Sequence, residues 1–186
     1  HSGTVSAARE ASMYGLPSIS TSLADYNEYE FLGAVNATMR VIEKAVSIIK
    51  TPPPSFMRRE GAESKPSGED KNLPISQFLH GNMMLNVNVP SNWNGTYRTG
   101  PHGARWYTAP TRISDTDEGQ FVEVGAATII NEGKEDSDIA TIENGGCSIT
   151  AMPVWPQLHP LSVPDTILKE ANIPDQDGFP AWLSSQ

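Results

Sequence analysis

The first residues of the chain, His1-Ser2-Gly3-Thr4, have the types and spacing with the clearest chemistry. A glycine between hydroxyl residues at the start of a helix presents free backbone N–H groups and side-chain hydroxyls to one point. The helix dipole adds partial positive charge there, so the arrangement suits a phosphate oxyanion. Serine and threonine are also the ordinary N-cap residues, and the segment taken alone is more simply interpreted as a structural cap.

Other residues that could take part in chemistry are three histidines, two acidic pairs and one cysteine: His80, His102, His159, Asp115/Asp117, Asp136/Asp138 and Cys147. The histidines lack the spacing of a zinc site. The acidic pairs could bind a divalent cation, but neither fits the calcium-loop pattern, and turn and helix-cap roles are the simpler interpretation. The cysteine has no cationic neighbour in sequence and lies in an expected strand, which predicts a buried, unreactive thiol.

Length and composition restrict the class of protein. The 186 residues suffice for one domain, and 38% hydrophobic with 19% charged residues predict a globular fold. A net charge of -9 argues against a nucleic-acid polymer as partner, but not against a small phosphorylated substrate. No apolar stretch is long enough to span a bilayer, so no membrane partner is expected. The single cysteine fits a reducing compartment, and we expect a cytoplasmic protein.

The first half of the chain predicts alternating helices and strands. A helix should follow the Ser-Gly-Thr segment and end near Gly15, before a strand over residues 17–23. A second helix, residues 29–50, has the strongest periodicity. Its predicted buried stripe is formed by Phe31, Val35, Met39, Ile42, Val46 and Ile49, and is widened by Ala34, Val41, Ala45 and Ile48.

The second half predicts a loop, several short strands and a tail. Residues 51–76 are expected to be a polar loop insertion, followed by a strand over residues 84–90. Two strands, residues 97–108 and 120–131, flank an acidic turn. A short helix starts at an acidic cap near Asp136, and a strand covers residues 147–153. The proline-rich tail, residues 154–186, is expected to wrap the surface. The pattern favours an α/β layered sheet with an antiparallel extension.

Three segments occur in an order that resembles the SurE family of phosphatases and nucleotidases. The first is His1-Ser2-Gly3-Thr4-Val5-Ser6-Ala7-Ala8-Arg9-Glu10-Ala11 with Gly15-Leu16-Pro17, which is similar to the family's (Y/H)SGTV-x-(A/G)A-x-E segment and its G-(L/I)-P strand. The second is Leu85-Asn86-Val87-Asn88-Val89-Pro90. The third runs from Asp136 to Met152 and resembles the family's D-x-x-A and G-x-(V/I)-S-(V/I)-T-P-L pattern.

The resemblance implies a three-layer, Rossmann-like α/β fold with a protruding C-terminal β-hairpin. It implies hydrolysis of phosphomonoesters, commonly nucleoside monophosphates, with Mg²⁺ or Mn²⁺ as cofactor and a homodimer or homotetramer as the assembly. On this basis residues 1–153 are the C-terminal part of a SurE-like phosphatase domain, with a hairpin extension over about residues 97–135. Ser2, Gly3 and Thr4 would belong to the phosphate-binding wall.

Departures from the family pattern leave a second interpretation open. The family's metal-binding acidic pair, serine and asparagine precede the Ser-Gly-Thr-Val motif, so no metal ligand is expected in this chain, and the first strands of the sheet would be missing. The chain begins at His1, which suggests a fragment of a longer polypeptide that is inactive by itself. The alternative is a non-catalytic SurE-like module for binding or oligomerisation. A chance Ser-Gly-Thr-Val in an unrelated α/β protein is hard to reconcile with the order of the motifs.

Overall fold

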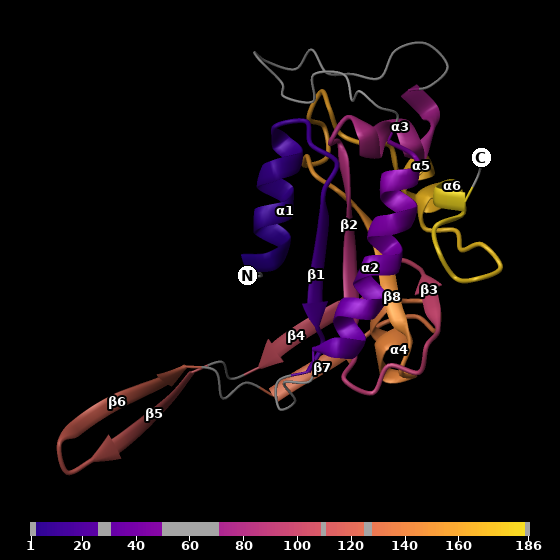
Figure 1. Ribbon diagram of the computed structural model, residues 1–186. Coiled ribbons are helices and arrows are strands. Elements are labelled where there is room, and N and C mark those ends of the chain that lie inside the picture. Colours follow the sequence, from indigo (N-terminus) through magenta and orange to yellow (C-terminus); the bar gives the residue numbers. More distant parts are fainter. Residues whose placement is uncertain (1–2, 26–30, 50–70, 109–110, 125–127, 185–186) are drawn as a thin grey trace.

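The computed structural model describes residues 3–25, 31–49, 71–108, 111–124 and 128–184. Helices and strands alternate in the first half of the chain, and a group of short strands follows (Figure 1). The helices and strands are, in chain order, α1 (Gly3–Met13), β1 (Ile19–Leu23), α2 (Leu32–Ser47), α3 (Pro74–Leu79), β2 (Met83–Val89), β3 (Tyr97–Thr99), β4 (Ala104–Thr108), β5 (Thr111–Thr116), β6 (Gly119–Val124), β7 (Thr128–Glu132), α4 (Asp138–Glu143), β8 (Cys147–Pro153), α5 (Asp165–Ala171) and α6 (Ala181–Ser184).

A four-stranded mixed sheet in the order β1-β2-β8-β3 forms the centre of the molecule. β1 and β2 are parallel, β8 runs antiparallel to β2, and β3 is parallel to β8. The three strands predicted over residues 17–23, 84–90 and 147–153 are thus present with small shifts of their ends. β2 is buried along most of its length, as expected for a strand covered on both faces.

Helices cover both faces of this sheet, as the alternation of side chains along β2 shows. Leu85 and Val87 pack with α2 in the main hydrophobic core. Met84, on the opposite face, packs with Ala8 of α1. α1 and α2 therefore lie on opposite faces (Figure 1), and the predicted three-layer α/β fold is confirmed.

The end of α1 agrees with the sequence pattern. The N–H of Gly15 donates to the carbonyl oxygen of Ser12. Gly15 has a φ of 86°, a left-handed conformation that costs glycine little. This turn brings the chain directly into β1, so that the start of α1 and the carboxyl end of β1 lie at the same end of the sheet (Figure 1).

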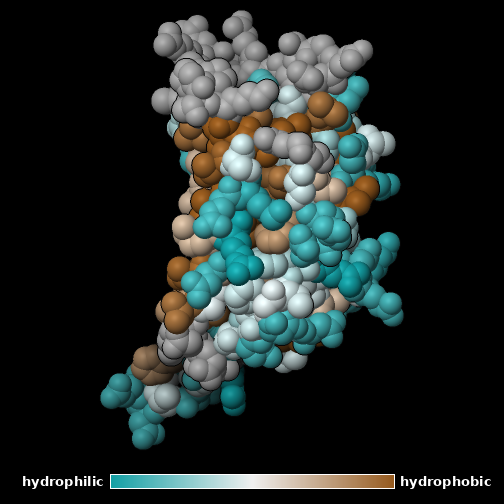
Figure 2. Space-filling model, turned by 45° about the vertical axis from the view of Figure 1, so that its right-hand side comes forward, coloured by the Kyte–Doolittle hydropathy of each residue, from teal (hydrophilic) through white to brown (hydrophobic). Residues whose placement is uncertain are grey.

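The predicted buried stripe of α2 is correct for its widening residues, Ala34, Val41, Ala45 and Ile48, and wrong for four of its six central residues. The face that packs on the sheet is formed by small and medium-sized side chains, namely Ala34, Ala37, Thr38, Val41, Ala45 and Ile48. Phe31, Val35, Met39 and Val46 are exposed by 55%, 52%, 48% and 58%. Small residues allow the helix axis to approach the sheet closely, which explains why the larger residues lie outside the contact. Figure 2 shows hydrophobic surface, in brown, along the left border of its view.

The segment predicted as one strand over residues 97–108 is divided in two. β3 belongs to the central sheet, whereas β4 pairs with β7 in a separate two-stranded ladder. β5 and β6 form a second ladder joined by a tight turn at the predicted acidic segment. Figure 1 shows these two ladders projecting from the lower end of the sheet as an arm, defined here as residues 104–132. The hairpin extension thus begins at β4 rather than at residue 97.

The C-terminal tail does more than wrap the surface. It contains α5 and α6, and Ile167, Trp182 and Leu183 are buried in the main core. Gly178 has a φ of 88°, and a Cβ at this position would meet the carbonyl oxygen of Tyr97. The tail is therefore a packed part of the same fold, because its apolar side chains complete the core beside β3.

Two further predictions concern local structure. Most of the expected loop insertion, residues 51–70, lies outside the described residues, and α3 begins at Pro74 within the predicted loop. The helix near residue 136 is capped by Ser137, whose side-chain oxygen accepts from the N–H of Ala140, rather than by an acidic residue. Within the described ranges, no helix has the length and apolar content required to cross a membrane.

Candidate functional site

A cavity of about 570 Å³ lies at the carboxyl ends of the parallel strands β1 and β2, where α/β proteins commonly bind ligands. Side chains from α1, β1, β2, β4 and α4 surround it, together with the loop before β4. Ten of its 17 lining residues have polar or charged side chains, among them three cationic or titratable nitrogen groups and two carboxylates. These and the other polar lining residues are Ser6, Arg9, Ser22, Asp25, Asn86, Asn88, His102, Arg105, Tyr107 and Asp138.

The floor of the cavity is a polar face of the central sheet. Asn86 and Asn88 point to the α1 side of β2, since they alternate with the buried Leu85 and Val87. The hydroxyl of Ser20 donates to the side-chain oxygen of Asn86 at 2.8 Å. On the neighbouring strand β8, Thr150 pairs with Asn86 and Ser148 pairs with Asn88, so the polar face continues across both strands. Buried polar groups are costly without partners, so this polar row within the sheet indicates a functional surface.

The wall formed by α1 brings a cationic side chain into the cavity. Val5 and Ser6 precede Arg9 by about one helical turn, so the three side chains lie on the same side of α1 and line the cavity. The Nε atom of Arg9 is buried and has no hydrogen-bond partner among the described residues. An unpaired guanidinium N–H costs free energy, and an anionic ligand in the cavity would supply the missing acceptor.

The Ser-Gly-Thr segment predicted as the phosphate-binding wall is described only in part. Gly3 and Thr4 form the first turn of α1 and are exposed, next to the lining residues Val5 and Ser6. Ser2 and His1 lie outside the described residues. The helix start is thus close to the cavity, whereas a role for Ser2, Gly3 and Thr4 in binding remains a prediction.

His102 and Asp138 form a close pair in the lining of the cavity. The Nδ1 atom of His102 lies 2.8 Å from Oδ2 of Asp138, whose side chain is only 5% exposed. The other oxygen of Asp138 accepts from the backbone N–H groups of Gly103 at 2.7 Å and Ile139 at 2.8 Å. The carboxylate is therefore fixed by three donors, and the imidazole is oriented by its bond to the carboxylate.

This pairing shifts the pKa of both groups. The hydrogen bond to Asp138 raises the pKa of His102 from its ordinary value of 6.5, against the effect of burial. Burial opposes ionisation of Asp138, but the hydrogen bonds from His102 and the two backbone N–H groups outweigh it and lower the pKa of the carboxyl group. Relative to the free side chains, the structure thus favours the imidazolium form of His102 and the carboxylate form of Asp138.

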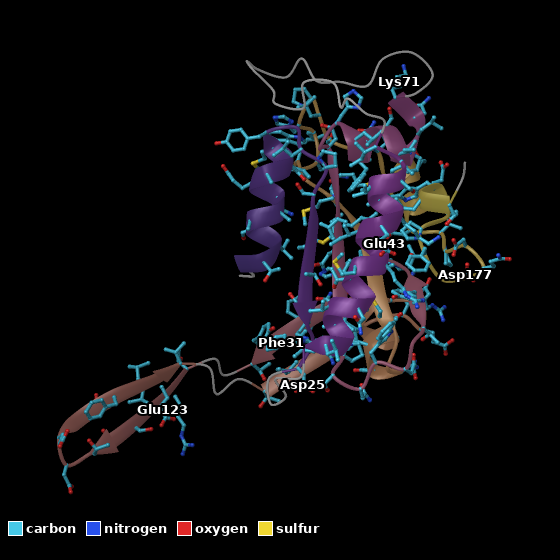
Figure 3. The ribbon with its side chains drawn as sticks, viewed as in Figure 1. Asp25, Phe31, Glu43, Lys71, Glu123 and Asp177 are labelled. Carbon is cyan, nitrogen blue, oxygen red and sulfur yellow. The ribbon has the colours of Figure 1, made fainter. Side chains whose placement is uncertain are left out.

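The described residues do not form a site for a divalent metal ion. No group of three histidine, cysteine or acidic side chains lies together within the described part of the chain. The two carboxylates of the cavity already accept hydrogen bonds, Asp138 from the groups above and Asp25 from the hydroxyl of Ser91 at 2.6 Å. Figure 3 shows Asp25 at the end of the sheet from which the arm projects. A cation here would have to displace these donors.

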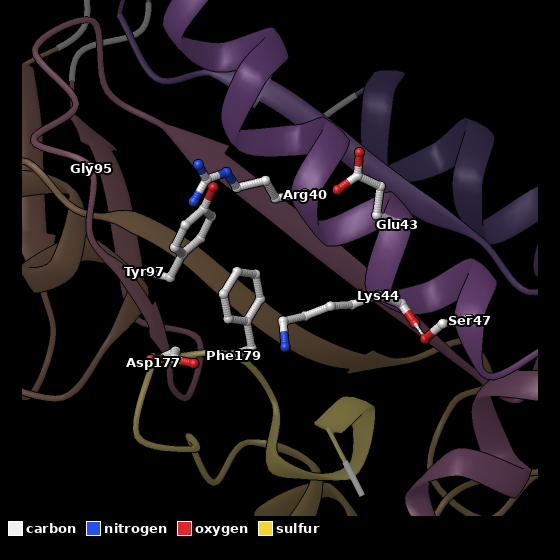
Figure 4. A pocket seen from close by; sticks show the side chains of 8 residues that line it. All are labelled: Arg40, Glu43, Lys44, Ser47, Gly95, Tyr97, Asp177 and Phe179. Atoms are coloured by element: carbon white, nitrogen blue, oxygen red, sulfur yellow. Dashed lines mark hydrogen bonds between the residues drawn. The ribbon is translucent and has the colours of Figure 1, made fainter. Parts of the chain in front are cut away.

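A second cavity, of about 820 Å³, lies on the other face of the sheet between α2, β3 and the C-terminal segment (Figure 4). Arg40 and Lys44 approach Tyr97 and Phe179 there, and the two rings are stacked at 4.3 Å. Lys44 Nζ lies 4.6 Å from the centre of the Phe179 ring and donates to Ser184. Burial, the largest effect, raises the pKa of Tyr97 to about 12. These contacts indicate a role in packing, because the Lys44 ammonium group and both aromatic rings already have partners.

Cys147 is buried, as predicted, and desolvation raises its pKa to about 12. In the sequence His102 is a scattered histidine and Asp138 a turn or cap residue, yet the two meet in the cavity. No local pattern joins them. The polar Asn86 and Asn88 inside an otherwise apolar strand were a signal that could have identified the floor.

Two comparisons relate the chain to known proteins. The chain is similar in structure to the SurE protein from Aquifex aeolicus, with a TM-score of 0.46 and 19% sequence identity. The match covers 84% of this chain and 53% of that protein, so the chain spans about half of its length. The family model for survival protein SurE matches residues 1–111, which is more than half of the chain. The chain belongs to the SurE family.

Proposed function

We propose that the protein containing this chain hydrolyses phosphomonoesters, with nucleoside monophosphates as the substrate class, and that the cavity beside α1 holds the phosphoryl group. Membership of the SurE family supports this class of reaction. The observation that carries the proposal in this chain is the buried Nε of Arg9, which has no acceptor among the described residues and lines a polar cavity. A phosphoryl oxygen is a suitable acceptor for a guanidinium N–H.

The other lining groups supply complementary donors. The N-terminal turn of α1 presents backbone N–H groups and a helix dipole, and we include Ser2, Gly3 and Thr4 in the phosphate-binding wall. The amides of Asn86 and Asn88 add donors from the floor. A volume of about 570 Å³ lies within the usual range for small-molecule sites. The cavity thus combines donors for an anion with room for an attached organic group.

A divalent ion is part of the proposal, because the family resemblance implies Mg²⁺ or Mn²⁺. Such an ion would polarise the phosphoryl group when bound. The described residues provide no set of ligands for it, as the carboxylates of the cavity are already hydrogen bonded. We therefore assign no residue of this chain to the metal and expect its ligands to be supplied by residues outside those described.

The role of the cavity is tested by comparing two arginine variants in the complete gene product. Arg9→Gln removes the charge from the candidate site, whereas Arg40→Gln removes one from the second cavity on the opposite face of the sheet. Loss of a charged hydrogen bond to phosphate costs about 1.5–3 kcal/mol, so kcat/KM should fall about 10- to 150-fold for Arg9→Gln. Arg40→Gln should remain within about twofold of the wild type.

The same pair of variants can refute the proposal. Equal effects of the two substitutions would show that the cavity beside α1 does not bind the substrate. Absence of hydrolysis in the wild-type protein with Mn²⁺ or Mg²⁺ would favour the non-catalytic SurE-like module. The observation in favour of that second function is the missing metal-ligand set within the described residues.

We further propose that the arm, residues 104–132, mediates a homodimer or homotetramer. The apolar side chains of Ile113, Val122 and Val124 lie on one face of the β5–β6 ladder and are exposed by 67%, 63% and 80%. Exposed apolar patches of this kind are typical of interaction sites. The base of the arm contributes Arg105 and Tyr107 of β4 to the cavity.

The net charge and the cysteine content bear on the partners and the cellular location of the protein. The net charge of -9 disfavours binding of nucleic-acid polymers and leaves small phosphorylated substrates as partners. We propose a cytoplasmic location, which is supported by the single cysteine, since one thiol cannot form an internal disulfide.

A further inference from the structure

We propose that His102 is the general acid that protonates the leaving oxygen of the phosphomonoester, and that Asp138 is its positioning residue. This inference rests on the proposed phosphatase function. His102 and Asp138 both line the cavity that Arg9 also lines. The pair is the one place in the cavity's described lining where an imidazole is hydrogen bonded to a buried carboxylate.

The geometry of the pair is that of an oriented acid. Nδ1 of His102 donates to Oδ2 of Asp138 at 2.8 Å, which leaves Nε2 as the nitrogen available to a substrate. The carboxylate cannot turn freely, because its other oxygen accepts from the N–H groups of Gly103 and Ile139. The imidazole is 56% exposed, so it can exchange its proton with water between turnovers.

The proposed step conserves atoms and charge. A water molecule attacks phosphorus and forms a new P–O bond as the P–O bond to the leaving oxygen breaks. The electron pair of the broken bond goes to the leaving oxygen, which takes the proton from Nε2 of His102. The imidazole then regains a proton from solvent, and the proton of the attacking water passes to the released phosphate or to bulk water. No oxidant or reductant is required.

The charges that face His102 come from every side of the cavity. The carboxylate of Asp138 stabilises the imidazolium, and its hydrogen bond raises the pKa of His102 above 6.5. A raised pKa extends to higher pH the range in which the imidazole carries the proton that a general acid donates. The remaining titratable or charged lining residues are Arg9, Asp25, Arg105 and Tyr107. The guanidinium groups of Arg9 and Arg105 and the carboxylate of Asp25 thus line the same cavity as the pair.

The test depends on the leaving group, and it uses the complete gene product with Mn²⁺. A nucleoside 5′-monophosphate releases a poor alkoxide leaving group that needs a proton, whereas 4-nitrophenyl phosphate releases a phenolate that does not. His102→Gln should lower kcat for the nucleotide about 10²- to 10⁴-fold and change kcat for 4-nitrophenyl phosphate less than about tenfold. His80→Gln, a histidine at the end of α3 and outside the cavity, should leave both rates unchanged.

The pH dependence gives a second readout that a purely structural role would not move. In the wild type, kcat for the nucleotide should fall as pH rises through the raised pKa of His102. Asp138→Asn should move that basic limb to lower pH, because it removes the group that favours the imidazolium. If substitution of His102 causes misfolding, the wild-type profile and Asp138→Asn still test the inference.

The outcomes separate this inference from the proposed function. A wild-type protein without phosphatase activity would refute both. An active wild type in which His102→Gln affects the two substrates equally, or neither, would refute the general acid alone. An unchanged pH profile in Asp138→Asn would also contradict it.

Discussion

The hydrogen-bonded pair of His102 and Asp138 makes the stability of the fold depend on pH. Folding raises the pKa of His102 above 6.5, so the stabilisation is fully present below pH 6.5 and is lost as pH rises through the folded-state value. Folding lowers the pKa of Asp138 below 3.8, so its stabilisation is present above pH 3.8 and is lost as pH falls through the lowered value. The interaction between His102 and Asp138 therefore contributes most to the free energy of unfolding above pH 3.8 and below the raised pKa of His102.

We expect His102→Gln to reduce the free energy of unfolding mainly in that window. The difference from the wild type should be about 1 kcal/mol, because solvent screens the half-exposed imidazole, and it should shrink at alkaline pH. Urea unfolding at about pH 5.5 and about pH 9 measures both values. Asp138→Asn should show the same trend, and stability differences independent of pH would contradict this account.

Sequence patterns predict only the region of the candidate site. Hydroxyl residues and glycine at a helix start suit a phosphate, and α1 begins at Gly3 beside the cavity, but binding by Ser2, Gly3 and Thr4 stays a prediction. His102 and Asp138 could not be paired from the sequence, since their contact depends on the loop before β4 folding against the start of α4. Arg9 is a basic residue of the motif, but the sequence does not show that its Nε atom is buried.

At the scale of elements, α2 shows why hydrophobic periodicity alone can select the wrong face. Two apolar stripes occur on this helix, and the larger side chains, such as Met39 and Val46, dominate a hydrophobicity pattern. The sheet instead packs against the smaller stripe that contains Ala37, Val41 and Ala45. The helix and its approximate ends were predictable, whereas its orientation depended on how closely it approaches β2.

The orientation of α2 predicts different costs for the same substitution at two positions of the 186-residue chain. Val41 is completely buried, whereas Val46 is 58% exposed. Val41→Ala should reduce the free energy of unfolding by about 1.5–3 kcal/mol, and Val46→Ala should change it by less than about 0.5 kcal/mol. Urea unfolding of both variants measures the difference. A larger loss of unfolding free energy for Val46→Ala than for Val41→Ala would show that the face predicted from periodicity is the buried one.

At the scale of the whole molecule, the three-layer body and the projecting arm have separate roles. The central sheet and its helices place the cavity at the carboxyl ends of β1 and β2. The arm extends from the same end and exposes most of its side chains (Figure 3). Alternating strands predicted an antiparallel extension, but its division into two ladders depends on pairings between distant segments.

We expect the double variant Ile113→Asp with Val122→Asp to shift the protein from an oligomer to a monomer. The two residues pair across β5 and β6 on one face of the arm, where added carboxylates would repel an apolar partner surface. Sedimentation velocity of the complete gene product measures the change. Glu123→Gln, on the other face of the same ladder, serves as the control and should leave the assembly intact. A monomeric wild type would contradict the role of the arm.

We propose that this member of the SurE family is part of a metal-dependent phosphomonoesterase. Phosphate release from a nucleoside 5′-monophosphate by the complete gene product, with Mn²⁺ or Mg²⁺ and with EDTA, tests this proposal. We expect turnover with the metal ion, loss of turnover in EDTA, and strongly reduced turnover in Arg9→Gln. Failure to release phosphate from nucleotides or from 4-nitrophenyl phosphate under any of these conditions, by a folded protein, would contradict it.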